Sequence, residues 1–139
     1  MTEGRPIIPI QPADSGGLSH GNVFPLLHEV RHALERLLES SEETVIDLRA
    51  IPMGPGEEAA IEEALGTGEV KVHIRAVGPS TLQETAYPGV WLITHFNESD
   101  QILSRFIEIT YLPSIVKSQR DDVRDALDAL THKLEQLRN

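Results

Sequence analysis

Residues 70–76, Val-Lys-Val-His-Ile-Arg-Ala, decide the fold, because apolar and polar side chains alternate through them. Alternation with a period of two is typical of a strand that has one buried and one solvated face. Turn signals follow at Gly78-Pro79, at Pro88-Gly89 and at 97–100, and they separate further β-prone runs. Those runs are 80–87, 90–93 and 102–111. Three short connections in succession predict an antiparallel meander of four strands.

Helical and strand-like segments flank the meander. Apolar side chains recur at helical spacing in residues 23–40, residues 44–48 form a short additional strand, and residues 57–65 form a second, short helix. A long helix over 118–138 closes the chain. The predicted fold class is therefore α+β, a mainly antiparallel sheet with helices packed on one face. Residues 1–22 are rich in Pro and Gly and are predicted to form a flexible tail, whereas 23–139 form a single domain.

The last predicted helix carries an apolar stripe that can be interpreted in two ways. Its members step by four and three residues, which is also the spacing of a coiled-coil seam; they are Val123, Leu127, Leu130, Leu134 and Leu137. Only about two heptads are present, so we expect the stripe to pack on the domain's own sheet. Self-association through the stripe is the alternative.

The composition excludes several classes of protein. None of the 139 residues is cysteine, so disulfide scaffolds, Cys-type zinc sites, iron–sulfur clusters on the chain's own thiolates and thiol catalysis are ruled out. Lys and Arg total 12 against 22 Asp and Glu, and a formal charge of −10 argues against nucleic-acid binding. No apolar run reaches the ~20 residues of a membrane span, and the first residues do not resemble a signal segment. We expect a cytoplasmic chain without membrane insertion and without a cofactor.

One short motif has the letters of a zinc site. His28-Glu29-Val30-Arg31-His32 spells H-E-x-x-H, in which two histidines on a helix bind zinc and the glutamate activates water. On a helical wheel, His28 and His32 lie about 100–140° from Leu27, outside the apolar stripe. A catalytic zinc needs a walled cleft, and no third ligand stands out downstream. We therefore predict a solvated helix face without metal; a zinc metalloenzyme using His28, His32 and Glu29 as base is the alternative.

Several segments together match a known family more specifically than any one of them alone. They are Leu65-Gly66-Thr67-Gly68-Glu69-Val70, Gln83-Glu84-Thr85, Gly89-Val90-Trp91, and Ile107-Glu108-Ile109 before Pro113. Upstream, residues 46–52 read Ile-Asp-Leu-Arg-Ala-Ile-Pro. This set resembles the conserved domain of the HyaF/HupH-type hydrogenase expression/formation proteins, whose patterns are LGxGEV, xExxxxGVW, xEIxxxPxxV and IDLxxLP. The resemblance extends over residues 23–137.

The resemblance implies a function as well as a fold. It implies a chaperone-like accessory protein, without chemistry of its own, in the maturation of nickel–iron hydrogenase. The implied partners are the iron–sulfur small subunit of the hydrogenase and other maturation proteins. A generic protein-interaction domain that serves another pathway is a third hypothesis beside the zinc metalloenzyme.

The resemblance also points to four positions for partner binding, which are Glu69, Glu84, Gly89 and Trp91. From the residues alone, we expect Trp91 to be a core anchor rather than an interface aromatic. Gly89 is expected at the positive-φ position of a Pro-Gly type II turn, and an ordinary surface carboxylate is the alternative for Glu84. Better-known members carry the domain pattern twice, whereas this chain has it once. We therefore also predict a homodimer.

Overall fold

The computed structural model describes residues 21–138. Three α-helices, five strands and two short 3-10 helices (η) follow one another within that range. They are α1 (Val23–Ser40), β1 (Thr44–Asp47), η1 (Leu48–Ala50), α2 (Glu57–Leu65), β2 (Lys71–Ile74), β3 (Ser80–Glu84), β4 (Val90–Phe96), β5 (Ile102–Ile109), η2 (Ser114–Val116) and α3 (Arg120–Arg138). The predicted α+β class and order of elements are confirmed. The tail predicted over 1–22 lies almost wholly outside the described residues.

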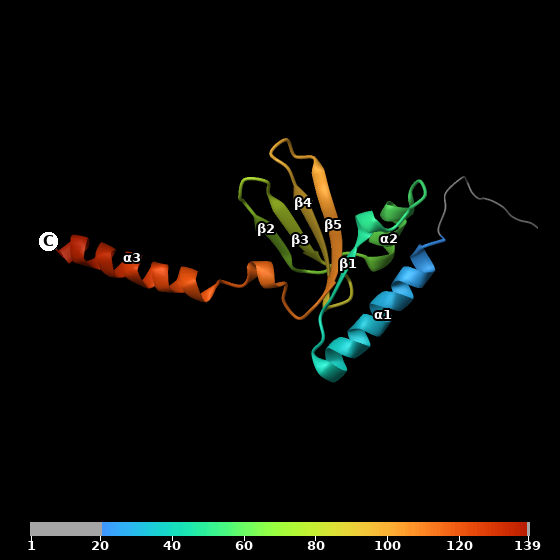
Figure 1. Cartoon of the computed structure of the whole chain (residues 1–139), viewed down its shortest axis with the longest axis horizontal. Helices are drawn as coiled ribbons and strands as arrows, with labels where there is room; N and C mark the ends of the chain where they lie inside the picture. The colour runs from blue at the N-terminus through green and yellow to red at the C-terminus, as the bar shows by residue number, and fades with distance from the viewer. Residues whose placement is uncertain (1–20, 139) are drawn as a thin grey trace, which may run out of the picture.

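The strands form one antiparallel sheet in the order β1-β5-β4-β3-β2 (Figure 1). β2 to β5 are the predicted meander, and β1 adds to it beside β5. At the centre of the sheet, Ile93 pairs with Leu82 on one side and with Phe106 on the other. The strand bounds differ from the prediction by a few residues: β3 ends early, at Glu84, and β4 continues to Phe96. A register shift at His95/Phe96 ends the regular β4–β5 pairing.

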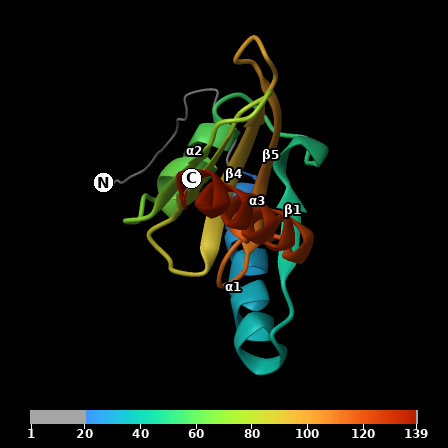
Figure 2. The ribbon, with the colours of Figure 1, turned by 90° about the vertical axis from the view of Figure 1, so that its left-hand side faces the viewer.

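One face of the sheet, here called the covered face, lies under α1 and α2 (Figures 1 and 2). The main core lies between these helices and the sheet. The helices contribute Leu26, Val30, Ala33, Leu37, Ile61 and Leu65, and the sheet contributes Ile46, Val90, Leu92, Ile107 and Ile109. All of these side chains are buried, because the apolar stripe of each helix meets the apolar side of the strands.

The opposite face, here called the open face, holds a smaller apolar cluster. Leu82, Trp91 and Ile93 are buried there, with Val72, Ile74, Phe106 and Val116 of η2 packed around them. Val72 and Ile74 are the alternating apolar residues on which the strand prediction for 70–76 depends. They are only half-buried, because β2 is an edge strand. No α-helix among the described residues lies on this face.

The position of α3 differs from our prediction. The helix begins at Arg120, two residues later than predicted, and extends away from the sheet (Figures 1 and 2). Every side chain in Arg120–Arg138 is exposed, so the expectation that its stripe packs on the domain's own sheet is wrong. None of the helices within residues 21–138 is long and apolar enough to cross a membrane.

A buried carboxylate fixes the start of α1 and the loop before α2. Glu57 is fully buried, and its oxygens accept hydrogen bonds from the Asn22 amide N–H at 2.7 Å and from Asn22 Nδ2 at 2.8 Å. The Gly54 N–H donates to it as well, at 3.2 Å. The other acidic residues of this helix, Glu58, Glu62 and Glu63, are half-buried or exposed, and Glu57 is the exception. Its carboxylate is buried because it satisfies backbone donors that the loop leaves unpaired.

Candidate partner-binding site

The segments that resemble the family meet at one end of the sheet, where β3 ends and β4 begins. The Glu84 carboxylate accepts hydrogen bonds from the backbone N–H groups of Glu69 and Val70, at 3.2 and 3.3 Å. The Gly68 N–H donates to the Glu84 carbonyl at 2.7 Å. Glu84 therefore holds the 68–70 segment against the sheet, which is a more specific role than that of an ordinary surface carboxylate.

Two glycines allow the backbone to close this end of the sheet. A Cβ on Gly68 would lie 2.3 Å from the Thr85 carbonyl oxygen, so only glycine fits there without a shift of backbone. Gly89 has φ +95°, and the Val90 N–H donates to the Tyr87 carbonyl at 2.9 Å across Pro88-Gly89. The predicted positive φ of Gly89 is confirmed, and the arrangement is that of a type II turn.

Trp91 anchors the same end from the open face. The residue is 4 % exposed, and its Nε1 donates to the Thr110 carbonyl at 3.2 Å. It lies between Glu84 and Glu108 in the sheet register. The expectation that Trp91 is a core anchor is thus confirmed, and the hydrogen bond ties β4 to the chain that leaves β5.

Glu108 and Glu43 belong to this end of the sheet, and sequence reasoning did not single them out. Glu108 faces Trp91 on one side and Val45 on the other. Burial raises the pKa of the Glu108 carboxyl, and the negative charge of Glu43 raises it further. Glu43 accepts a hydrogen bond from the Thr110 hydroxyl. The sequence did contain a signal that could have identified Glu108, because it is the acidic residue of Ile107-Glu108-Ile109, one of the segments that resemble the family.

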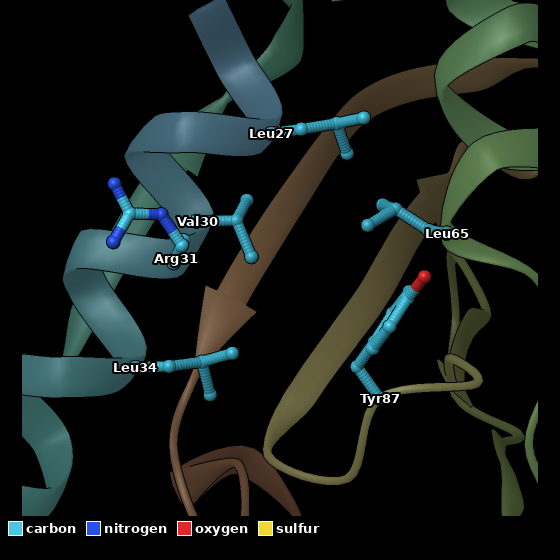
Figure 3. A pocket seen from close by; sticks show the side chains of 6 residues that line it. All are labelled: Leu27, Val30, Arg31, Leu34, Leu65 and Tyr87. Atoms are coloured by element: carbon cyan, nitrogen blue, oxygen red, sulfur yellow. The ribbon is translucent and has the colours of Figure 1, made fainter. Parts of the chain in front are cut away.

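An apolar groove runs between α1 and the 85–89 turn (Figure 3). This α1 groove has a volume of about 270 Å³, and its lining comprises Leu27, Val30, Arg31, Leu34, Leu65 and Tyr87. Gly89 brings the turn close to the helix, because a Cβ there would lie 3.4 Å from Leu34 Cδ2. Tyr87 is 52 % exposed and forms one wall. The Arg31 stem lines the rim, but its guanidinium points away from Leu65 and Tyr87 (Figure 3) and pairs with Glu35 at 3.5 Å. The groove therefore suits an apolar side chain.

The H-E-x-x-H residues lie on the outer side of α1. His28 and His32 are exposed; His28 Nδ1 lies 3.5 Å from Arg31 Nη2, and His32 Nδ1 lies 3.2 Å from Glu35 Oε1. Within residues 21–138, no three His, Asp or Glu side chains are grouped so as to hold a metal ion. Contacts at i,i+3 on a solvated helix account for the positions of both histidines.

A serine and a histidine meet on the open face without forming a catalytic triad. Ser80 Oγ lies 2.6 Å from His95 Nδ1, and the His95 ring packs edge-on against Phe106. Ser80 is buried, so its hydroxyl has little access to a substrate. No carboxylate in the described part of the chain contacts His95, and the third group that orients a catalytic histidine is therefore missing there.

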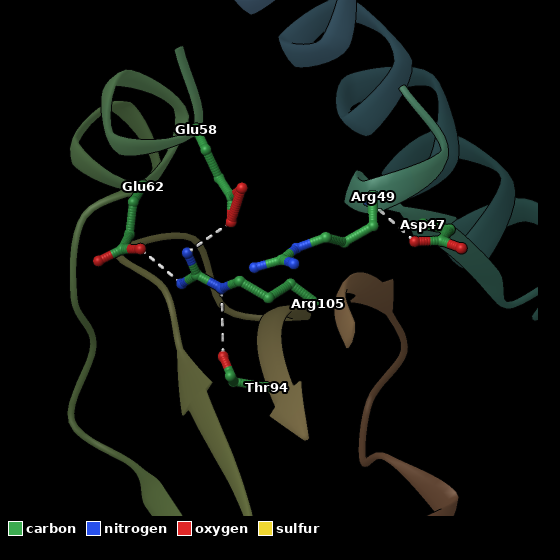
Figure 4. Close-up of polar contacts among 6 residues, drawn as sticks. All are labelled: Asp47, Arg49, Glu58, Glu62, Thr94 and Arg105. Atoms are coloured by element: carbon green, nitrogen blue, oxygen red, sulfur yellow. Dashed lines mark hydrogen bonds and ion pairs between the residues drawn. The ribbon is translucent and has the colours of Figure 1, made fainter. Parts of the chain in front are cut away.

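A charged network joins α2 to the covered face (Figure 4). Arg105 of β5 donates to Glu58 Oε2 at 2.9 Å, to Thr94 Oγ1 at 3.3 Å, and to Glu62. Burial alone would lower the pKa of Arg105, but the two glutamates more than offset it and raise the pKa. Arg49 extends toward the same cluster from η1 (Figure 4). From the sequence, Arg105 could be recognised only as a basic residue at an inward-facing position of β5, and its glutamate partners could not be predicted.

The four predicted partner-binding residues thus lie at one end of the sheet but on two sides of it. Glu84 and Trp91 are neighbours on the open face, and Glu69 is held there by Glu84. Gly89 lies beside the α1 groove on the other side. All four shape the backbone between the groove and the open face, and Glu69 is the one that is exposed.

The sequence of this chain is similar to a known family region and to several named proteins. The conserved C-terminal region of the HupH hydrogenase expression protein matches residues 21–137. Hydrogenase expression/formation protein HoxQ of Azotobacter vinelandii is 30 % identical over 111 residues, which are 78 % of this chain and 39 % of that protein. HupH of Rhizobium leguminosarum bv. viciae is 30 % identical over 115 residues, which are 83 % of this chain and 40 % of that protein. The chain thus spans about two fifths of the length of these relatives.

A solved structure is similar over most of the chain. Hydrogenase expression protein HupH from Thiobacillus denitrificans superposes with a TM-score of 0.81 at 44 % sequence identity. The match covers 84 % of this chain and 97 % of that one. From the match to the family region and these likenesses, the chain belongs to the family of HupH hydrogenase expression proteins, in which it corresponds to the C-terminal conserved region.

Proposed function

We propose that the chain is an accessory protein of hydrogenase maturation that acts by binding and not by catalysis. Its relatives carry the name of hydrogenase expression/formation proteins, which supports the accessory role. The two constellations that resemble catalytic sites, H-E-x-x-H and Ser80–His95, lack a third group among the described residues. What the structure offers to a partner is an apolar groove.

The proposed partner is the iron–sulfur small subunit of a nickel–iron hydrogenase, together with other maturation proteins, in the cytoplasm. The chain has no cysteine and therefore no thiolate that could compete for the cluster. A protein of this kind handles the small-subunit polypeptide and leaves the cluster ligands to that subunit.

The α1 groove is the observation that carries the proposal. It combines apolar walls with a tyrosine that is half exposed, and tyrosine is one of the residue types that contribute most binding energy at protein interfaces. The turn that forms one wall contains Gly89, and Trp91 and Glu84 fix the strands on which this turn is built. In this proposal Gly89, Glu84 and Trp91 position the wall, and exposed Glu69 lies near its edge.

A second copy of the chain is a further proposed partner. The relatives are longer than this chain, and pairing of two copies would place two such domains in one particle. This homodimer does not depend on the hydrogenase partner, because the α1 groove and the surfaces considered below are different.

Capture of the small subunit tests the proposal. Tagged full-length chain, expressed in cells that make a nickel–iron hydrogenase, is expected to retain the small-subunit precursor. Leu34→Asp puts a charge in the groove, and Tyr87→Ala removes one wall with little risk to the fold. Both are expected to lower the captured amount about tenfold or more, as loss of an interface anchor does. Leu38→Asp is the matched control, because Leu38 is 78 % exposed on the same helix and does not line the groove.

The outcome is decided by comparing the variants. Equal capture by all three and by the unchanged chain would show that the groove is not the binding site. Absence of every hydrogenase protein from the eluate of the unchanged chain would contradict the proposed function itself. Circular dichroism of each purified variant separates lost binding from lost folding.

A further inference from the structure

The apolar stripe of α3 has no partner within the described chain. Its five members, Val123, Leu127, Leu130, Leu134 and Leu137, are between 55 % and 71 % exposed. A stripe of this length in contact with water is unfavourable, and it is typical of a surface that another protein covers. The question is which surface fits it.

The charges of α3 are arranged around the stripe by sign. Its basic residues lie about 60–100° from the centre of the stripe on a helical wheel, whereas its acidic residues lie about 100–160° away. The basic residues are Arg120, Arg124, Lys133 and Arg138, and the acidic ones are Asp121, Asp122, Asp125, Asp128 and Glu135. The contacting side of α3 is therefore apolar with basic margins, and it calls for an apolar surface with acidic margins.

The open face of the sheet has that composition. Its charged strand residues are all acidic, namely Asp47, Glu84 and Glu108, and the register places them around the apolar cluster of Leu82, Trp91 and Ile93. No Lys or Arg occupies an open-face position of the five described strands. The covered face is the reverse, because its charged residues are Lys71 and Arg105, and the glutamates of α2 meet Arg105 there. Among residues 21–138, no corresponding helix of opposite charge lies on the open face.

The chain's own geometry directs α3 away from its own open face. Only residues 117–119 connect η2 to α3, and Lys117 is extended, with φ −79° and ψ 130°. A short, extended hinge favours exchange between two copies over folding back within one. Pairing of two α3 helices with each other is disfavoured. Lys133 and Arg138 flank the stripe, and in a coiled coil they would lie close to the basic residues of the other helix and be repelled by them.

We propose that two copies of this chain form a dimer by exchanging α3, with the stripe of each α3 lying on the open face of the other copy. The stripe from Val123 to Leu137 is about 21 Å long, and the eight residues of β5 span about 27 Å, so it fits along the strands. The exchange specifies the surfaces of the homodimer proposed above and rests on that dimer, but not on the hydrogenase partner.

Sedimentation velocity on the full-length chain tests the exchange. The unchanged chain is expected to sediment as a dimer, and Leu127→Asp with Leu134→Asp is expected to give a monomer. Ala129→Asp with Gln136→Asp is the matched control, because it adds the same two charges at the same spacing on the other side of α3, and it is expected to remain dimeric. A monomeric unchanged chain at high concentration would overturn both the dimer and the exchange. A dimer that survives the two stripe substitutions would overturn the exchange alone.

Charge reversal tests the specific pairing of helix and sheet. Arg124→Glu with Lys133→Glu changes the helix, Glu108→Lys changes the face, and each variant alone is expected to dimerise about tenfold more weakly. An equal mixture of the two variants is expected to recover the dimer, because each helix then meets a face of opposite charge in the heterodimer. No recovery on mixing would contradict the pairing. If a hydrogenase protein instead binds the monomeric chain through α3, the proposal that a second copy covers the α3 stripe would also be overturned.

Discussion

The two faces of the sheet differ in the sign of their charged strand residues and in the size of their apolar clusters. The covered face has basic strand residues, a large apolar core and two helices whose glutamates neutralise Arg105. The open face has acidic strand residues, a smaller apolar cluster and no α-helix among the described residues. The fold therefore covers one face with its own helices, whereas the other face is complementary to an apolar surface with basic charges at its margins. The segments that resemble the family lie at one end of this sheet, where Trp91 is on the open face and Gly89 is beside the α1 groove.

The largest expected effect concerns two neighbouring residues of β5 that point to opposite faces. Ile107 is fully buried on the covered face, and Phe106 is half-buried on the open face. Ile107→Ala is expected to lower the free energy of unfolding by about 2–5 kcal/mol, because it leaves a cavity in the main core. Phe106→Ala is expected to cost less, although more atoms are removed, because its site is already partly hydrated. Urea unfolding measures both free energies, and an equal or larger loss for Phe106→Ala would contradict the assignment of the main core to the covered face.

A middle-sized effect is expected from the charge pairing on the covered face. Arg105 is 14 % exposed in its side chain and joins Glu58 and Glu62. Arg105→Ala is expected to lower the free energy of unfolding by about 1–2 kcal/mol, because the half-buried Glu58 carboxylate and the exposed Glu62 carboxylate lose their shared donor. Arg49→Ala, which alters an exposed arginine near the same cluster, is the control and is expected to stay within ~0.5 kcal/mol of the unchanged chain. Equal losses would show that the network contributes nothing specific.

A still smaller effect on stability is expected from Glu108 on the open face. The pKa of Glu108 is raised in the folded chain by burial and by Glu43, so the folded state disfavours its ionised form. This carboxyl therefore contributes most stability below its unfolded pKa of about 4.3 and loses that contribution as the pH rises through the folded pKa. Glu108→Gln is expected to raise the melting temperature slightly at pH 7 and to make no difference near pH 3.5. A lower melting temperature at pH 7 would contradict this assignment.

Much of the fold could be predicted because local patterns and tertiary structure agree. The alternation in 70–76 and the turns at Pro88-Gly89 and 97–100 give the meander, and α1 and α2 have the predicted bounds. The family segments meet at one end of the sheet, but they did not distinguish residues that shape the backbone, such as Glu84, from residues that could contact a partner.

The remaining features depend on contacts that no local pattern contains. The buried position of Glu57 follows from a backbone donor at Asn22, which is 35 residues away in the sequence at the start of α1, together with the Gly54 N–H just before α2. The groove requires Tyr87 to meet Leu34 of α1, and these two residues are 53 positions apart in the sequence. The stripe of α3 was recognised, but its spacing is the same whether the helix packs on its own sheet or on another chain, so the pattern could not decide its position.

In the proposed function, the protein acts by binding through the α1 groove and not by metal chemistry. Complementation of cells that lack this chain tests this most directly. Tyr87→Ala changes the groove, and Glu29→Ala removes the only general base that the H-E-x-x-H motif offers. At equal protein levels, we predict that Glu29→Ala restores hydrogenase activity as fully as the unchanged chain, whereas Tyr87→Ala restores much less. Full activity with Tyr87→Ala together with loss of activity with Glu29→Ala would contradict the account.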